Sequence, residues 1–436
     1  MNYKWTFTEK FIFRFCFVFF IVYIFPFPLN AISFSNELLS LNQKIAGWYY
    51  AVFDSYYGIW HRFVPWIGKH VLHLSYPIVT FTNGSGDTTY DYVLFLTFFN
   101  ISLLAAIFWT VLDRKRREYT AAFYWLRVLV RYYLAVTLFS YGFSKVFHVQ
   151  MAFPFLYQLV EPFGDKSPMG LAWSFVGFSR AYSAFTGWGE IIGGGLLFFR
   201  RTTTFGAVLS MVVIGNIVAI NFCYDVPVKI FSSTLFIMSV FLAAPDLKRL
   251  LYIFIFNRAT QPVIYKNFVH IRWQRITVRC FKALFIIYTF YSSISGSLQG
   301  QLEYGDRRTL PPLYGIYNTS LFIRNKDTTL PLTTDTTRWK QLIIDFDKNV
   351  QIKFMNDKFQ WFSFTVDTLQ HQVTLNSYVN TITKANLSYK IDGSWLTLSG
   401  YLFDDSVYIR MKKYDAHSFN LMNRGFHWIN EYPFNR

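Results

Sequence analysis

Charged residues are scarce in this sequence. Asp, Glu, Lys and Arg make up 15% of the 436 residues, whereas hydrophobic residues make up 53%. Ordinary soluble domains carry about 25% charged residues. The low charge content and the positive mean hydropathy argue against an ordinary soluble protein. They favour a membrane core, and the length leaves room for a second domain.

Cysteine is also scarce. The three cysteines, Cys16, Cys223 and Cys280, lie in or at the end of apolar segments, without a CxxC motif or a Cys/His spacing suited to zinc or iron–sulfur clusters. A dithiol mechanism is therefore disfavoured, and the last third of the chain must fold without disulfides. His70 and His73 could share a face of a helix, but no third ligand is near them in the sequence. We therefore predict no metal site.

Acidic residues are fewer than basic residues. The sequence has 25 Asp and Glu and 42 Lys and Arg, which gives a net charge of +17. The basic residues cluster beside apolar segments, as in RKRR at 114–117 and RR at 200–201. Cytoplasmic loops of membrane proteins have this arrangement, which also attracts anionic lipid. Aromatic residues reach 21%, which suits lipid-facing Phe and interfacial Tyr and Trp. We therefore predict a lipid bilayer as partner and no nucleic acid.

Seven apolar runs are predicted to cross the membrane as helices. They are residues 11–25, 90–112, 121–147, 183–199, 205–222, 228–244 and 276–294. Seven spans from a cytoplasmic N-terminus place the strong basic clusters in the cytoplasm and the C-terminal domain outside. This topology predicts a multi-pass inner-membrane protein with a periplasmic C-terminal domain.

The first apolar run could instead be a cleaved signal peptide, because it follows Lys4 and Lys10. We favour a retained helix, since the run is bulky, contains Arg14 and is not followed by a small-x-small cleavage site. The domains expected are N-terminal membrane helices with an interfacial periplasmic connector of short helices at 1–120, a bundle at 121–244, a cytoplasmic surface segment with the last span at 245–298, and a β-domain at 299–436.

The C-terminal region changes to alternating apolar and polar residues with turn signals. Three hairpins are predicted, around Asn356 and Asp357, around Asp392 and Gly393, and around Asp404 and Asp405. The fold class expected is thus an α-helical polytopic membrane protein with an all-β antiparallel meander, either a sandwich or a partly closed barrel of lipocalin-like size. The closing residues 423–436 are expected to pack as a plug or edge clasp.

Ionisable side chains inside apolar segments mark a candidate site, because they are costly in lipid unless paired or hydrated. Lys145 and Glu190 are the candidate catalytic residues. The candidate ligand-binding residues, placed at a similar predicted depth, are Tyr141, His148, Asn216, Asn221, Asp225 and Lys229. The alternative is that Lys145 and Glu190 form an ion pair that only joins two helices. The glycines of GWGEIIGGG at 187–195 are expected to permit close helix packing.

Two stretches resemble the DoxX family of four-helix membrane proteins. They are RYYLAVTLFSYGFSKVF at 131–147 and GWGEIIGGGLLFFRRTTTFGA at 187–207. FCYDVPVK at 222–229 also resembles the membrane domain of vitamin-K-dependent carboxylase-like proteins. The DoxX resemblance implies a four-helix bundle, redox work such as that of a thiosulfate:quinone oxidoreductase subunit, and a role for Lys145 and Glu190.

Three functions remain open at this point. The first is binding of a quinone or other small amphipathic ligand in an outward-facing bundle pocket, in a redox or envelope-maintenance role, with a possible oxidoreductase activity. The second is a non-enzymatic membrane anchor or assembly subunit whose β-domain binds a periplasmic partner. The third is a small-molecule transporter.

Overall fold

The computed structural model describes residues 5–29, 43–81, 83–263, 271–378 and 384–435. These form two compact units. The first unit, called the helical unit here, comprises Met1–Gln150 and Ala181–Gln299. The second, the barrel unit, comprises Met151–Arg180 and Gly300–Arg436. A segment between two long helices therefore belongs to the same unit as the C-terminal strands.

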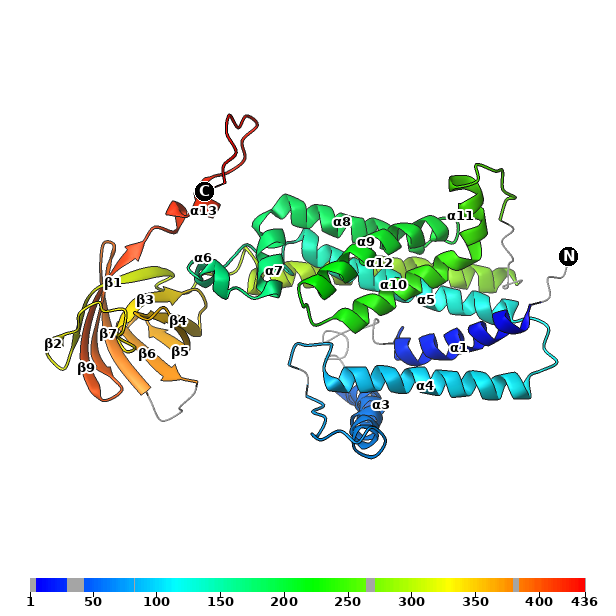
Figure 1. Cartoon of the computed structure of the whole chain (residues 1–436), viewed down its shortest axis with the longest axis horizontal. Helices are drawn as coiled ribbons and strands as arrows, with labels where there is room; N and C mark the ends of the chain where they lie inside the picture. The colour runs from blue at the N-terminus through cyan, green and yellow to red at the C-terminus, as the bar shows by residue number, and fades with distance from the viewer. Residues whose placement is uncertain (1–4, 30–42, 82, 264–270, 379–383, 436) are drawn as a thin grey trace. The chain divides into compact units, whose positions relative to one another are not determined.

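Long helices build the helical unit (Figure 1). They are α1 (Phe7–Ile24), α3 (Gln43–His70), α4 (Thr89–Leu112), α5 (Thr120–Val146), α8 (Arg180–Leu197), α9 (Thr203–Cys223), α10 (Lys229–Ala243), α11 (Leu247–Phe254) and α12 (Arg272–Glu303). A short 3-10 turn, Ala244–Asp246, connects α10 to α11. The connector predicted as short interfacial helices instead contains α3, a single helix of 28 residues.

Four stretches among the described residues are helical, long and apolar enough to cross a membrane. They are α4, α5, α9 and the stretch Lys229–Phe254, which contains α10 and α11. These helices indicate a multi-pass membrane protein. The other three predicted spans fall on α1, α8 and α12, so they are helical, but their crossing of the membrane stays a prediction.

Arg14 is the charged residue inside the apolar run 11–25, and the structure gives it partners. It is 2% exposed and bonds residues at the ends of α4 and α5. Its Nε and Nη2 donate to the Tyr119 hydroxyl at 3.1 and 2.7 Å, and its Nη1 donates to Thr110 Oγ1 at 2.8 Å. Nη2 also donates to the carbonyl oxygen of Asp113 at 3.0 Å. A buried guanidinium bonded in this way joins α1 to its neighbours without being left unsatisfied.

Glycines allow α5 and α8 to touch through their backbones. A Cβ added at Gly187 would lie 2.5 Å from the carbonyl oxygen of Gly142, and one added at Gly142 would lie 2.8 Å from that of Gly187. Real Cβ atoms do not approach so closely. The two glycines therefore set the separation of these helices, as the glycine-rich sequence predicted.

The barrel unit contains an eight-stranded antiparallel barrel (Figure 1). Its strands are β1 (Gly315–Arg324), β3 (Trp339–Ile344), β4 (Asn349–Phe354), β5 (Phe359–Asp367), β6 (Gln372–Ser377), β7 (Lys384–Asp392), β8 (Trp395–Leu402) and β9 (Asp405–Tyr414). Each strand pairs with the next, and β1 also pairs with β9, which closes the sheet. The short strand β2 (Asp327–Thr328) pairs with β1.

The three predicted hairpins are confirmed as β4–β5, β7–β8 and β8–β9. The sandwich alternative is wrong, because the pairing of β1 with β9 closes the sheet. Side chains alternate along each strand, so Val407, Ile409 and Met411 of β9 are buried inside the barrel. Complete closure leaves no long unpaired edge in the barrel.

The segment between α5 and α8 packs on the outside of the barrel. It contains α6 (Leu156–Leu159), a 3-10 turn (Phe163–Asp165) and α7 (Pro168–Phe178). Leu156 is 4% exposed and packs against Ile316 and Ile343. The C-terminal tail, expected to pack as a plug or clasp, instead has exposed rings, with Trp428 at 90%.

Candidate functional site

Lys145 near the end of α5 and Glu190 in the middle of α8 form an ion pair. Both are buried, with exposed fractions of 5% and 1%. Ser183 lies beside the pair and its hydroxyl donates to the carbonyl oxygen of Lys145 at 2.9 Å. The structure thus brings together the two candidate catalytic residues. Whether they act in chemistry stays a prediction.

The described cavity nearest in sequence to this pair is not lined by it. A cavity of about 230 Å³ lies between α5 and α12, but it is lined by hydroxyl side chains such as Ser140, Ser144 and Thr289, and not by Lys145 or Glu190. One carboxylate oxygen of Glu190, Oε2, is buried and has no hydrogen-bond partner among the described residues. The pair therefore joins two helices and leaves one acceptor unused.

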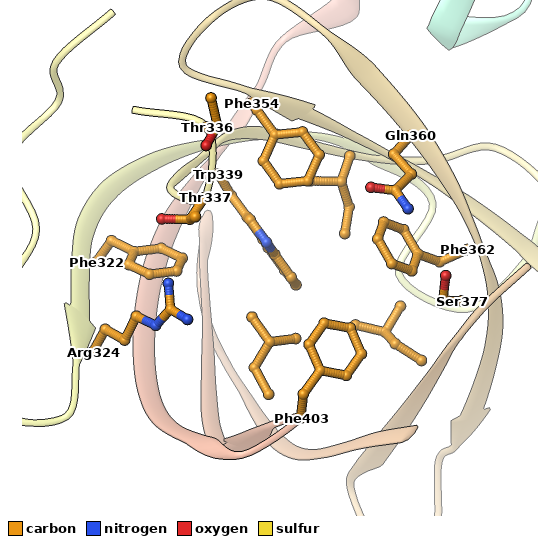
Figure 2. A pocket seen from close by; sticks show the side chains of 13 residues that line it. Phe322, Arg324, Thr336, Thr337, Trp339, Phe354, Gln360, Phe362, Ser377 and Phe403 are labelled. Atoms are coloured by element: carbon orange, nitrogen blue, oxygen red, sulfur yellow. The ribbon is translucent and has the colours of Figure 1, made fainter. Parts of the chain in front are cut away.

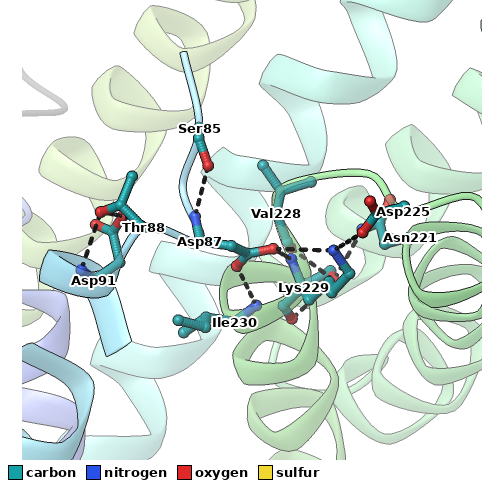
Figure 3. Close-up of polar contacts among 10 residues, drawn as sticks. Ser85, Asp87, Thr88, Asp91, Asn221, Asp225, Val228, Lys229 and Ile230 are labelled. Atoms are coloured by element: carbon teal, nitrogen blue, oxygen red, sulfur yellow. Dashed lines mark hydrogen bonds and ion pairs between the residues drawn. The ribbon is translucent and has the colours of Figure 1, made fainter. Parts of the chain in front are cut away.

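Three of the candidate ligand-binding residues form a second polar cluster at the start of α10 (Figure 3). Lys229 Nζ lies 2.7 Å from Asp225 Oδ1. Asn221 donates to the hydroxyl of Ser232 at 2.9 Å and is buried. Asp225 adopts a left-handed backbone conformation, with φ of 51°. This cluster connects the end of α9 with the first turn of α10.

Asp87 is part of this cluster, and sequence reasoning missed it. Its carboxylate accepts the backbone N–H of Lys229 at 2.7 Å and that of Ile230 at 3.0 Å, so it caps α10 from a residue far away in the chain (Figure 3). Its Oδ2 also lies 3.8 Å from Lys229 Nζ. Capping is normally provided by the residue just before a helix, so no local spacing signals this contact.

The remaining candidates are dispersed. Tyr141 is 39% exposed on α5, and its ring centre lies 6.1 Å from that of Phe231. His148 is buried and has a φ of 58° just after α5. Asn216 is exposed on α9. That these residues line one pocket together with Lys145 and Glu190 stays a prediction.

The barrel contains a cavity of about 280 Å³ that sequence reasoning did not identify (Figure 2). It lies at one end of the barrel, because its lining includes Arg324 at the end of β1, Trp339 at the start of β3, Phe354 at the end of β4 and Phe403 in the turn after β8. Small-molecule sites measure about 300–1,000 Å³, so this one suits a small ligand. Eight-stranded barrels have an interior of a size that side chains fill or that holds one small ligand.

Phe403 reaches the cavity from a backbone conformation that bulky residues rarely adopt. Its φ is 60°, in the left-handed region that glycine and asparagine favour. The residue lines the cavity from the two-residue turn between β8 and β9. Such conformations persist where the surroundings fix them, and they gather at ligand sites.

Arg324 is the charged residue among the side chains that line this cavity. It forms an ion pair with Asp405, to which its Nε donates at 2.7 Å. Asn325 donates to the other carboxylate oxygen at 2.5 Å. Hydrogen bonds from Arg324, and then from Asn325, lower the pKa of Asp405. The carboxylate is thus held ionised against the guanidinium.

A metal centre is not seen in the part of the chain that the structure describes. No group of three or more His, Cys, Asp or Glu residues there is arranged to hold a metal ion.

These features define a multi-pass membrane protein that carries a closed antiparallel β-barrel with an internal cavity. The chain is 38% identical over 133 residues to the uncharacterized protein YwoB of Bacillus subtilis (strain 168), an alignment that covers 28% of this chain and 79% of YwoB. Through this similarity the chain belongs to the same family as YwoB, whose name states no activity. No family model and no solved structure matches the chain. The resemblance to the DoxX family stays a prediction.

Proposed function

We propose that the protein is a non-enzymatic, membrane-anchored binding protein whose β-barrel takes a small amphipathic molecule. The observation that carries this proposal is the cavity of about 280 Å³ inside the closed barrel. Its lining is rich in aromatic side chains, including Phe322, Trp339, Phe354 and Phe362. Such rings supply large apolar contact areas. A few polar side chains at the same cavity can fix the orientation of the ligand.

The membrane helices supply the anchor in this proposal. With seven spans and a cytoplasmic N-terminus, the barrel lies on the outer side of the cytoplasmic membrane. An amphipathic ligand partitions into the bilayer, so anchoring places the cavity where its ligand is concentrated. The basic clusters at 114–117 and 200–201 support this orientation.

The test uses the full chain in lipid nanodiscs and an apolar fluorescent probe, N-phenylnaphthylamine. Gln360 lines the cavity from β5, so Gln360→Trp fills it. Thr365 lies on the same strand but is exposed, so Thr365→Trp adds the same side chain outside. We expect Gln360→Trp to abolish saturable probe binding and Thr365→Trp to retain it. Equal binding by both variants would contradict the proposal.

A second candidate function is the quinone-linked redox role of the bundle. It is favoured by Glu190 Oε2, a buried carboxylate oxygen without a hydrogen-bond partner among the described residues, which could accept a proton or a ligand hydroxyl. Lys145 would then polarise a ligand carbonyl. The test is quinone binding and reduction by the purified protein and by the Lys145→Met, Glu190→Gln double variant. Wild-type behaviour of that variant would remove the bundle site.

A further inference from the structure

The charge at the barrel cavity is balanced before any ligand enters. Arg324 is bonded to Asp405 through its Nε, and Asn325 holds the second oxygen of the same carboxylate. Figure 2 shows the Arg324 guanidinium beside Phe322 at the cavity. A cation that is already paired offers little net attraction to an incoming anion.

The charge of the Arg324 guanidinium also acts on a second carboxylate, that of Asp335. Asp335 precedes β3, and its Oδ1 accepts the backbone N–H groups of Thr337 at 2.7 Å and Arg338 at 2.9 Å. Burial raises the pKa of Asp335, but these hydrogen bonds, with the charge of Arg324 as a smaller contribution, lower it overall. Asp335 is therefore ionised as well, and its charge acts on Arg338 in addition to Arg324.

The other polar groups of the lining are uncharged. They are the hydroxyls of Thr336, Thr337 and Ser377 and the amide of Gln360. In Figure 2, Gln360 and Ser377 lie across the cavity from Arg324 and the threonines. Hydroxyl and amide groups can donate to or accept from a neutral polar ligand on either side.

We infer that the cavity is selective for an uncharged amphiphile, with an alkyl chain or ring among the aromatic side chains and a hydroxyl or carbonyl group at the polar lining. This inference rests on the proposed function and deepens it. An anionic ligand would bring a second negative charge to Arg324, whose guanidinium is already neutralised by Asp405. A cationic ligand would meet the guanidinium itself. Burying an uncompensated charge costs far more than burying a hydrogen-bonded neutral group.

The experiment compares two probes of equal chain length, decanol and decanoate, on the full chain in nanodiscs of uncharged lipid. At about pH 8 the acid is ionised. Binding to Gln360→Trp is subtracted, which removes partition into the lipid. We expect decanol to bind the wild type roughly tenfold or more tightly than decanoate. Tighter binding of decanoate would overturn the inference and leave the proposed function standing.

A matched pair of turn variants tests the cause of the selectivity. Asp405→Asn removes the charge that faces Arg324, whereas Asp404→Asn removes the neighbouring charge from an exposed position. We expect Asp405→Asn to strengthen decanoate binding by about tenfold and to change decanol binding less than about twofold. Asp404→Asn should leave both unchanged. Equal effects of the two variants would overturn the inference.

The failure of the inference is distinguishable from failure of the proposed function. Absence of saturable binding by both probes, in every variant, would refute binding in the cavity altogether. Thermal unfolding of each variant checks that a loss of binding does not come from loss of the fold.

Discussion

Lys145 and Glu190 form a buried ion pair that connects the C-terminal part of α5 to the middle of α8. Each side chain is the charge partner that makes burial of the other tolerable. Removing one partner leaves an uncompensated charge, whereas removing both leaves none. The stability of single and double variants therefore measures the structural contribution of the pair.

The first prediction concerns the stability of single and double variants of this pair. Lys145→Met should lower stability by about 3–5 kcal/mol, because Glu190 stays buried without its partner. The Lys145→Met, Glu190→Gln double variant should recover most of this loss. Thermal unfolding of the full chain in detergent measures both effects. A double variant as unstable as the single one would argue against the pair as the source of the loss.

The second prediction concerns the glycine contact between α5 and α8. Gly187→Ala should destabilise the helical unit by about 1–3 kcal/mol, because its Cβ would meet the carbonyl oxygen of Gly142 at 2.5 Å. Gly195→Ala is the matched control on the same helix, since its nearest contact would be an ordinary 3.8 Å to the Phe139 ring. Unfolding midpoints in detergent should fall for the first variant and not for the second.

The third prediction concerns the turn that carries Phe403. Asparagine tolerates the left-handed conformation far better than phenylalanine, so Phe403→Asn relieves backbone strain of about 1–2 kcal/mol while losing apolar contact. We expect the stability of the barrel unit to change by no more than about 1 kcal/mol. Probe binding in the cavity should nevertheless weaken. A variant that binds as the wild type does would show that the ring does not contribute to the site.

The fourth prediction concerns pH and the buried carboxylate Asp345, which is paired with Arg308 at 2.5 Å. Burial raises the pKa of Asp345 above its usual value of about 3.9, although Arg308 acts in the opposite direction. The folded chain therefore binds this proton more tightly than the unfolded chain. The resulting stability is complete below the usual pKa and is lost as pH rises through the raised pKa.

Asp345→Asn should remove this contribution to the pH dependence, and Asp404→Asn, at an exposed turn, should retain it. Hydrogen exchange of the barrel strands across the acidic pH range measures the effect. A contribution from Asp345 that increases with pH in this window would contradict the prediction.

The fifth prediction concerns orientation in the membrane. In a background without Cys16, Cys223 and Cys280, single cysteines at Ser394 and Lys115 report the β7–β8 turn and the loop after α4, both exposed. A membrane-impermeant maleimide added to intact cells should label Ser394→Cys and leave Lys115→Cys unlabelled until the membrane is opened. The reverse pattern would invert the proposed topology.

Local signals in the sequence predicted the hairpins, but they did not predict that the sheet closes into a barrel. The turn residues Asp357, Gly393 and Asp404 lie in hairpins where alternation of apolar residues fixes the register, so β4–β5, β7–β8 and β8–β9 could be predicted. The pairing of Ile316 in β1 with Tyr414 in β9 depends on the twist of the whole sheet. No short pattern reports it, so the sequence left a sandwich and a barrel both open.

The site residues also divide into those that the sequence signals and those that it does not. Lys145 and Glu190 are conspicuous because charge is costly in an apolar segment, and the structure pairs them. Asp87 lies in a polar loop, where an aspartate is ordinary, and its role at α10 depends on a contact across the fold. Trp339 and Phe362 are apolar aromatic residues, which are ordinary on the buried face of any strand and do not signal a binding site. A cavity between them depends on how the barrel interior is filled, which spacing along the chain does not encode.

The division of the barrel unit into two chain segments affects how it can be separated from the rest. The chain passes between the units after Gln150, after Arg180 and after Gln299. A single protease cut after Gln299 would leave the excised fragment without α6, so the apolar pair Ile316 and Ile343 would lose the cover of Leu156. Expression of residues 300–436 alone would thus expose this pair and favour aggregation. A fragment that reproduces the natural surface must also carry residues 151–180, joined through a new linker.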